Sequence, residues 1–122
     1  MMRGLLVAAF LLGITSGAKA LTGDQLLRSC EISLRTLQTS GENVTFAPEG
    51  KTCWVYMTAV QDLLVLSRTD SERWLRACPD PESTLGQLVR VFTLYALKKP
   101  ARLHERASGL VMEAMWEAFP CN

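Results

Sequence analysis

Apolar residues recur at intervals of three and four along most of the chain, which is the spacing of one face of an α-helix. No convincing strand pattern competes with this period. The first helical stripe begins after Thr22 and Gln25, which are spaced as a capping box, and the helix is predicted to end near Ser40. Its apolar positions are Leu26, Cys30, Leu34 and Leu37. Cys30 is therefore expected on a buried face.

A loop that includes Pro48 is predicted to lead into a second helix, from about Lys51 to Arg68. Two neighbouring apolar stripes give this helix an unusually wide apolar arc, so we expect it at the centre of the fold. One stripe consists of Cys53, Met57, Val60 and Leu64, and the other of Tyr56, Ala59, Leu63 and Leu66.

Pro79 and Pro81 break the helical pattern between residues 69 and 83, where a short helix over 71–77 is compatible with the sequence. Cys78 lies at this break.

Two further helices complete the pattern. Thr84 and Gln87 form a second capping-box pair at the start of a third helix, which Pro100 terminates. A fourth helix is predicted from about Arg102 to Ala118. The fold class that follows is all-α, a small disulfide-stapled bundle of about four helices.

The N-terminal residues have the pattern of an export signal. Arg3 precedes an apolar stretch over residues 5–14, and residues 17–20 form a small-residue cleavage site before Leu21. We predict a signal peptide over 1–20, cleaved after Ala20, and a single domain over 21–122. The expected location is the periplasm, with no membrane segment left after cleavage.

Charge argues against nucleic acid as a partner. The chain has 13 basic and 12 acidic residues, and removal of Arg3 and Lys19 with the signal leaves 11 against 12, a formal net charge of −1. Phosphate binding needs a basic excess on one face.

The four cysteines, in an exported domain, are expected to form two disulfides, and spacing alone leaves all three connectivities open. Zinc is not expected, because the chain has no Cys-x-x-Cys motif and has one histidine, His104. No cofactor is predicted either.

Three stretches resemble the Rap/Tai immunity proteins of type VI secretion amidase systems. They are Cys53–Asp62; Cys78-Pro79 with residues 84–89, Tyr95 and Pro100; and residues 107–121, ending in Phe119-Pro120-Cys121. The match departs from the family at Val55 and Ala59, where the family often has glycine.

This resemblance implies an all-α periplasmic protein, often a homodimer, that binds and blocks a secreted peptidoglycan amidase. It implies a protein partner and no catalytic role for the chain itself. The alternative is a periplasmic assembly or stress-related binding module with no toxin partner.

For the disulfides we predict the pairs Cys53–Cys78 and Cys30–Cys121. The first would tie the central helix to the proline-rich turn, and the second would join the first helix to the C-terminal residues.

An enzyme is the competing class of function. His104 beside a free cysteine would suit a cysteine hydrolase, but pairing of all four cysteines would remove the nucleophile. We expect His104 to be an exposed surface histidine.

The expected partner-binding residues cluster at the turn between the last two helices, where Pro100 forces a sharp bend. They are Lys98, Lys99, Arg102 and Arg106, joined by Trp116, which falls outside the buried stripe of its helix. Asp62 is expected to form a structural hydrogen bond or ion pair, with Arg106 as a reasonable partner.

Overall fold

The structure is a computed structural model that describes residues 19–40, 48–71 and 73–122. The apolar part of the predicted signal peptide, and most of the predicted loop after the first helix, lie outside these residues. The described chain forms four α-helices and one short 3₁₀-helix, and it contains no strand beyond two isolated bridges. The predicted all-α bundle is confirmed. The helices are α1 (Gly23–Ser40), α2 (Pro48–Thr69), α3 (Leu85–Leu97) and α4 (Ala107–Ala118), with η1 (Pro100–Arg102) before α4.

Both predicted capping boxes are present. The backbone N–H of Gln87 donates to Thr84 Oγ1 at 3.2 Å, and that of Thr84 donates to Gln87 Oε1 at 2.7 Å. Thr22 and Gln25 exchange the corresponding two bonds, at 3.3 and 3.0 Å, at the start of α1. These bonds satisfy backbone donors that have no partner within the helix, which is why the two helices begin where the sequence predicts.

The predicted start of α2 is wrong by one turn, because Pro48 begins the helix and does not belong to the loop before it. Proline suits this position, since its missing N–H is one that a helix start leaves unpaired.

The predicted start of α4 near Arg102 is also wrong, because contacts with a distant segment delay the helix until Ala107. Residues before Ala107 are held out of the helix by the N-terminus of α1: the N–H groups of Gly23 and Asp24 donate to the carbonyls of Glu105 and Leu103. The N–H of Ala107 in turn donates to the carbonyl of Leu21. Residues 102–106 have a helix-forming pattern, but these backbone hydrogen bonds to the start of α1 keep them out of the helix.

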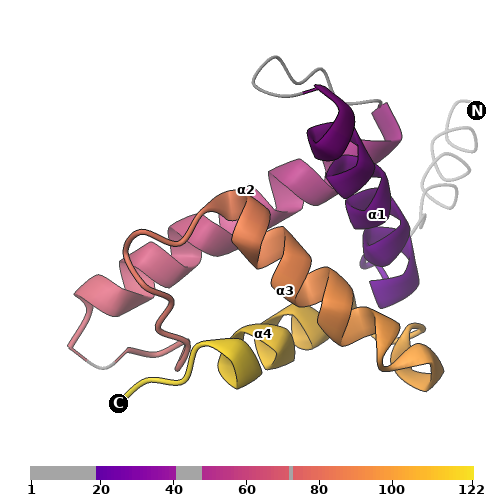
Figure 1. Cartoon of the computed structure of the whole chain (residues 1–122). Coiled ribbons are helices and arrows are strands. Elements are labelled where there is room, and N and C mark those ends of the chain that lie inside the picture. Colours follow the sequence, from indigo (N-terminus) through magenta and orange to yellow (C-terminus); the bar gives the residue numbers. More distant parts are fainter. Residues whose placement is uncertain (1–18, 41–47, 72) are drawn as a thin grey trace, which may run out of the picture.

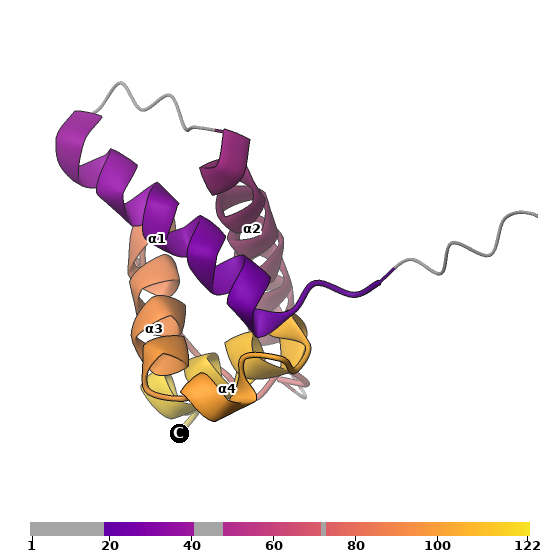
Figure 2. The same cartoon turned by 90° about the vertical axis from the view of Figure 1, so that its right-hand side faces the viewer.

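The helices pack around one core. α1 crosses α2 and α3, and α4 lies across the end of the bundle at which α1 begins (Figures 1 and 2). All four helices contribute to this core, whose largest fully buried side chains are Phe92, Leu26, Met57, Leu64, Leu88, Leu110 and Met115.

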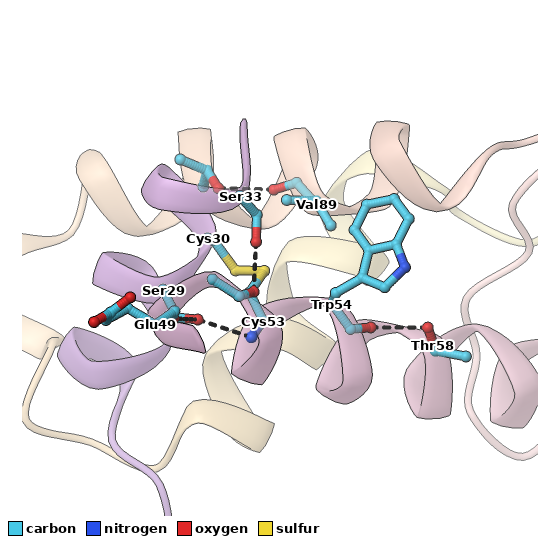
Figure 3. The surroundings of a disulfide bond; sticks show 10 residues. Ser29, Cys30, Ser33, Glu49, Cys53, Trp54, Thr58 and Val89 are labelled. Atoms are coloured by element: carbon cyan, nitrogen blue, oxygen red, sulfur yellow. Dashed lines mark hydrogen bonds between the residues drawn. A yellow bond between two sulfur atoms is a disulfide. The ribbon is translucent and has the colours of Figure 1, made fainter. Parts of the chain in front are cut away.

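The predicted disulfide pairing is wrong, since the bonds join Cys30 to Cys53 and Cys78 to Cys121. Cys30 and Cys53 are both fully buried at the contact between α1 and α2 (Figure 3). The predicted pair Cys53–Cys78 would have tied α2 to the proline-rich turn. The start of α2 packs against α1 instead.

Two serines of α1 fix that contact. Ser29 Oγ donates to the carbonyl of Glu49 and accepts from the N–H of Cys53 at 2.9 Å, while Ser33 Oγ donates to the carbonyl of Gly50 at 2.6 Å (Figure 3). A Cβ on Gly50 would lie 3.2 Å from Ser33 Oγ, so glycine permits this close approach.

The second disulfide joins neighbouring segments as well. The N–H of Cys78 donates to the carbonyl of Phe119 at 2.8 Å, and Ala77 bridges Pro120. The C-terminal residues therefore run back along the segment after α2, which brings Cys121 beside Cys78.

Candidate functional site: the α3–α4 turn and two surface hollows

The turn between α3 and α4 is organised by Arg102. Its guanidinium donates to both oxygens of Glu113 on α4, at 2.6 and 2.8 Å, and to both oxygens of Glu105, at 2.9 and 2.8 Å. Tyr95 on α3 joins the network, since its hydroxyl donates to Glu113 Oε2 at 2.6 Å. Paired N–H···O bonds of this kind fix geometry as well as adding energy. The turn is therefore tied to both of the helices that it connects.

This network shifts the ionisation of its carboxylates. The hydrogen bonds from Arg102, and then from Tyr95, lower the pKa of Glu113 to about 2. The hydrogen bond from the same guanidinium lowers the pKa of Glu105. In return the two carboxylates raise the pKa of Arg102. All three groups therefore carry their charges at neutral pH.

The four basic residues predicted to bind a partner do not have the same surroundings. Arg102 is occupied by the network, and Lys99 lies with its Nζ 5.5 Å from the centre of the Tyr95 ring. Lys98 and Arg106 are exposed, and neither forms an ion pair with any described residue. The charges best placed for a partner are therefore Lys98 and Arg106. We call residues 98–106 the basic turn.

The predicted contact between Asp62 and Arg106 is absent from the described chain: both side chains are exposed and they form no ion pair. The prediction failed because Asp62 lies on the exposed side of α2, while the preceding Gln61 makes the contact to another segment, donating from Nε2 to the carbonyl of Ser83 at 3.4 Å.

His104 is exposed, as predicted, and all four cysteines are in disulfides. The structure therefore offers no thiolate for the cysteine-hydrolase reading. Among the described residues no cluster of His, Cys, Asp and Glu has the arrangement of a metal site.

Trp116 lines an open cleft of about 570 Å³ near the C-terminal residues. Its indole is 46% exposed, and its Nε1–H donates to the carbonyl of Leu75 at 2.6 Å. The cleft is completed by Arg73, Arg76, Pro120 and Cys121. Neither arginine was expected at a site, since 71–77 was compatible with a short helix; the described residues of this segment form turns instead.

A second hollow, of about 250 Å³, lies between α2 and α4 and is lined by apolar groups. Its lining residues are Tyr56, Ala59, Val60, Leu63, Leu75, Ser108, Val111 and Met112. Burial raises the pKa of Tyr56, whose hydroxyl forms a hydrogen bond with the side chain of Ser108.

The expectation that α2 is central is wrong for one side of the helix. Four positions that share one face, Val55, Ala59, Leu63 and Leu66, are exposed, with Val55 at 69%. The other helices cover the side that carries Cys53, Met57 and Leu64. We call the four exposed positions the apolar face of α2.

A small all-α domain with two disulfides, a rigid charged turn and an uncovered apolar helix face is typical of an exported binding module. Residues 22–121 match the family model of the Rap1a immunity proteins, and the chain belongs to this family. No curated protein and no solved structure matches the chain significantly.

Family membership and the two disulfides together indicate an exported protein that gives immunity to a toxin effector, and its partner is that effector protein. None of the described helices combines the length and the apolar character that a membrane crossing demands.

Proposed function

We propose that the chain is a non-catalytic periplasmic immunity protein that blocks a secreted peptidoglycan amidase by occupying its active-site cleft. The observation that carries this proposal is the family match over residues 22–121. The export signal over 1–20 and the domain over 21–122 belong to the same proposal, since a cell-wall amidase acts in the compartment that the signal would lead to.

The basic turn is the proposed contact element. Because Arg102 is bound to Glu105 and Glu113, little conformational freedom is left for a partner to remove on binding. Lys98 and Arg106 remain exposed at its surface, and positive charges on a protruding turn favour capture by an acidic cleft. The turn lies at the corner where α3 ends (Figure 1).

The test is inhibition of an amidase encoded beside this protein. We expect the purified mature chain to stop release of peptides from peptidoglycan at an equimolar ratio. A Lys98→Glu/Arg106→Glu variant should bind the amidase with an association rate at least about tenfold lower, because steering charges act mainly on this rate. Its melting temperature should hardly change, since exposed charges contribute little to folding.

Lys51→Glu/Arg90→Glu is the matched control, with two charges reversed at exposed positions outside the turn. Equal slowing in both variants would show a general charge effect and remove the turn from the proposal. If no adjacent amidase is inhibited at all, the chain is better described as an assembly or stress-related module.

A homodimer is the second part of the proposal, with the apolar face of α2 as the contact between copies. Apolar positions on four successive turns of one helix face are unusual on a monomer surface. A Leu63→Glu variant should sediment as a monomer if the wild type is a dimer. A wild type that is monomeric at high concentration excludes this part alone.

A further inference from the structure

The cleft beside Trp116 is built on an unusual stretch of backbone. Arg73 and Arg76 have φ of 44° and 55°, in the left-handed region that glycine occupies readily and arginine rarely does. Both backbone twists lie within one turn, and both side chains border the same cleft. Residues in this conformation persist only when their neighbours hold them there.

Three neighbours hold this turn. The buried Ser67 hydroxyl on α2 accepts from the N–H of Leu75 at 2.9 Å, and the Trp116 indole donates to the carbonyl of the same residue at 2.6 Å. The Cys78–Cys121 disulfide fixes the next residues to the C-terminal segment. The positions of the two arginine main chains are therefore set by the fold before any ligand arrives.

The cleft has the chemistry of a carboxylate site. Arg73 Nη1 already lies 3.5 Å from the main-chain oxygen of Asn122, so an oxygen acceptor is accommodated at this edge. Arg76 is exposed and forms no ion pair with any residue that the structure describes. A planar guanidinium matches a carboxylate in paired hydrogen bonds, and the exposed part of the Trp116 ring offers an apolar surface beside it.

We propose that this cleft binds a short acidic peptide, with a carboxylate on Arg73 and Arg76 and an apolar side chain against Trp116. A volume of about 570 Å³ is within the range of pockets for small ligands. The concave shape favours a short peptide over a flat protein surface. This inference does not depend on the amidase, whose proposed contact is the basic turn.

Calorimetric titration of the mature protein tests the proposal with three probes: N-acetyl-Leu-Glu with both carboxylates free, its diamide N-acetyl-Leu-Gln amide, and inorganic phosphate. We expect the diacid to bind at least about tenfold more tightly than the diamide, because charged hydrogen bonds are the stronger ones. Binding of the diamide as tight as that of the diacid would overturn the proposal, as would no binding of any probe. Phosphate binding as tightly as the diacid would overturn the peptide assignment and leave a plain anion site.

An Arg76→Gly variant separates binding from folding. Glycine adopts a φ of 55° without strain, so this variant should melt no lower than the wild type. It should nevertheless bind the diacid at least about tenfold more weakly, since it lacks the guanidinium. Arg90→Gln, a charge removed outside the cleft, should bind as the wild type does. Undiminished binding by Arg76→Gly would place the peptide elsewhere and refute the site.

Discussion

Single side chains in this protein serve the fold in places where charge alone had suggested a partner. Arg102 stands among basic residues in the sequence, yet its guanidinium donates to two carboxylates of its own chain. The residues of this cluster that are left to contact a partner are therefore Lys98 and Arg106. No sequence pattern separates these roles, because Glu113 lies 11 positions from Arg102 and reaches it only through the packing of α4.

At this scale the low pKa of Glu113 predicts acid sensitivity. Its pKa of about 2 lies below the ordinary 4.5, so the carboxylate adds stability above pH 4.5 that is lost as the pH falls towards 2. Replacing Glu113 with Gln should lower the melting temperature at pH 7 and flatten its decline between these pH values. Glu117→Gln, an exposed neighbour outside the network, is the control. Parallel melting curves for Glu113→Gln and the wild type across this range would contradict the role given to the network.

At the scale of elements, alanine substitutions at the crowded Gly23 and the open Gly109 should change stability in opposite directions. A Cβ on Gly23 would collide with the buried Leu110 and lie 3.2 Å from the carbonyl of Leu103, whereas a Cβ on Gly109 would meet no atom within 4 Å. Gly23→Ala should therefore destabilise the fold by about 1–3 kcal/mol through overpacking. Gly109→Ala, in the first turn of α4, should stabilise it by up to about 0.5–1 kcal/mol, the value for glycine replaced in a helix interior. Urea unfolding measures both, and a Gly23→Ala variant as stable as the wild type would contradict the close contact between the start of α1 and Leu110 of α4.

The helices themselves were predictable because their signals are local. Periodic apolar positions and the capping pairs at Thr22 and Thr84 placed α1 and α3 closely. What could not be predicted depends on contacts between distant segments: the late start of α4, set by backbone bonds to Gly23 and Asp24, and the left-handed turn at Arg73. The same limit applies to the site. The basic turn was visible in the sequence, while the cleft at Trp116 was not.

At the scale of the whole molecule, the two disulfides should contribute unequally to stability. Loop entropy alone gives about 3.4 kcal/mol for a separation of 23 residues and about 4.0 kcal/mol for one of 43. Cys30 and Cys53 are fully buried, however, so their removal also leaves a cavity between α1 and α2. We expect Cys30→Ala/Cys53→Ala to unfold at lower denaturant concentration than Cys78→Ala/Cys121→Ala.

Under mild reduction, the disulfide that contributes less to stability, Cys78–Cys121, should be the first to break. Cys78 and Cys121 are partly exposed, so a small thiol reductant should open their bond first. Mass mapping of alkylated peptides follows both bonds. Initial loss of Cys30–Cys53 would contradict the packing of α1 on α2.

The pairing of consecutive cysteines also bears on how the protein is made. A chain that crosses a membrane from its N-terminus presents Cys30 and Cys53 to the oxidising side before the other two cysteines arrive. The first bond can therefore close on a partly exported chain with no competing thiol, and the second can close when Cys121 follows Cys78. If the chain is exported from its N-terminus, as the proposed signal implies, each native bond forms between the thiols available at that moment. Maturation of this protein in cells should consequently proceed without a disulfide isomerase.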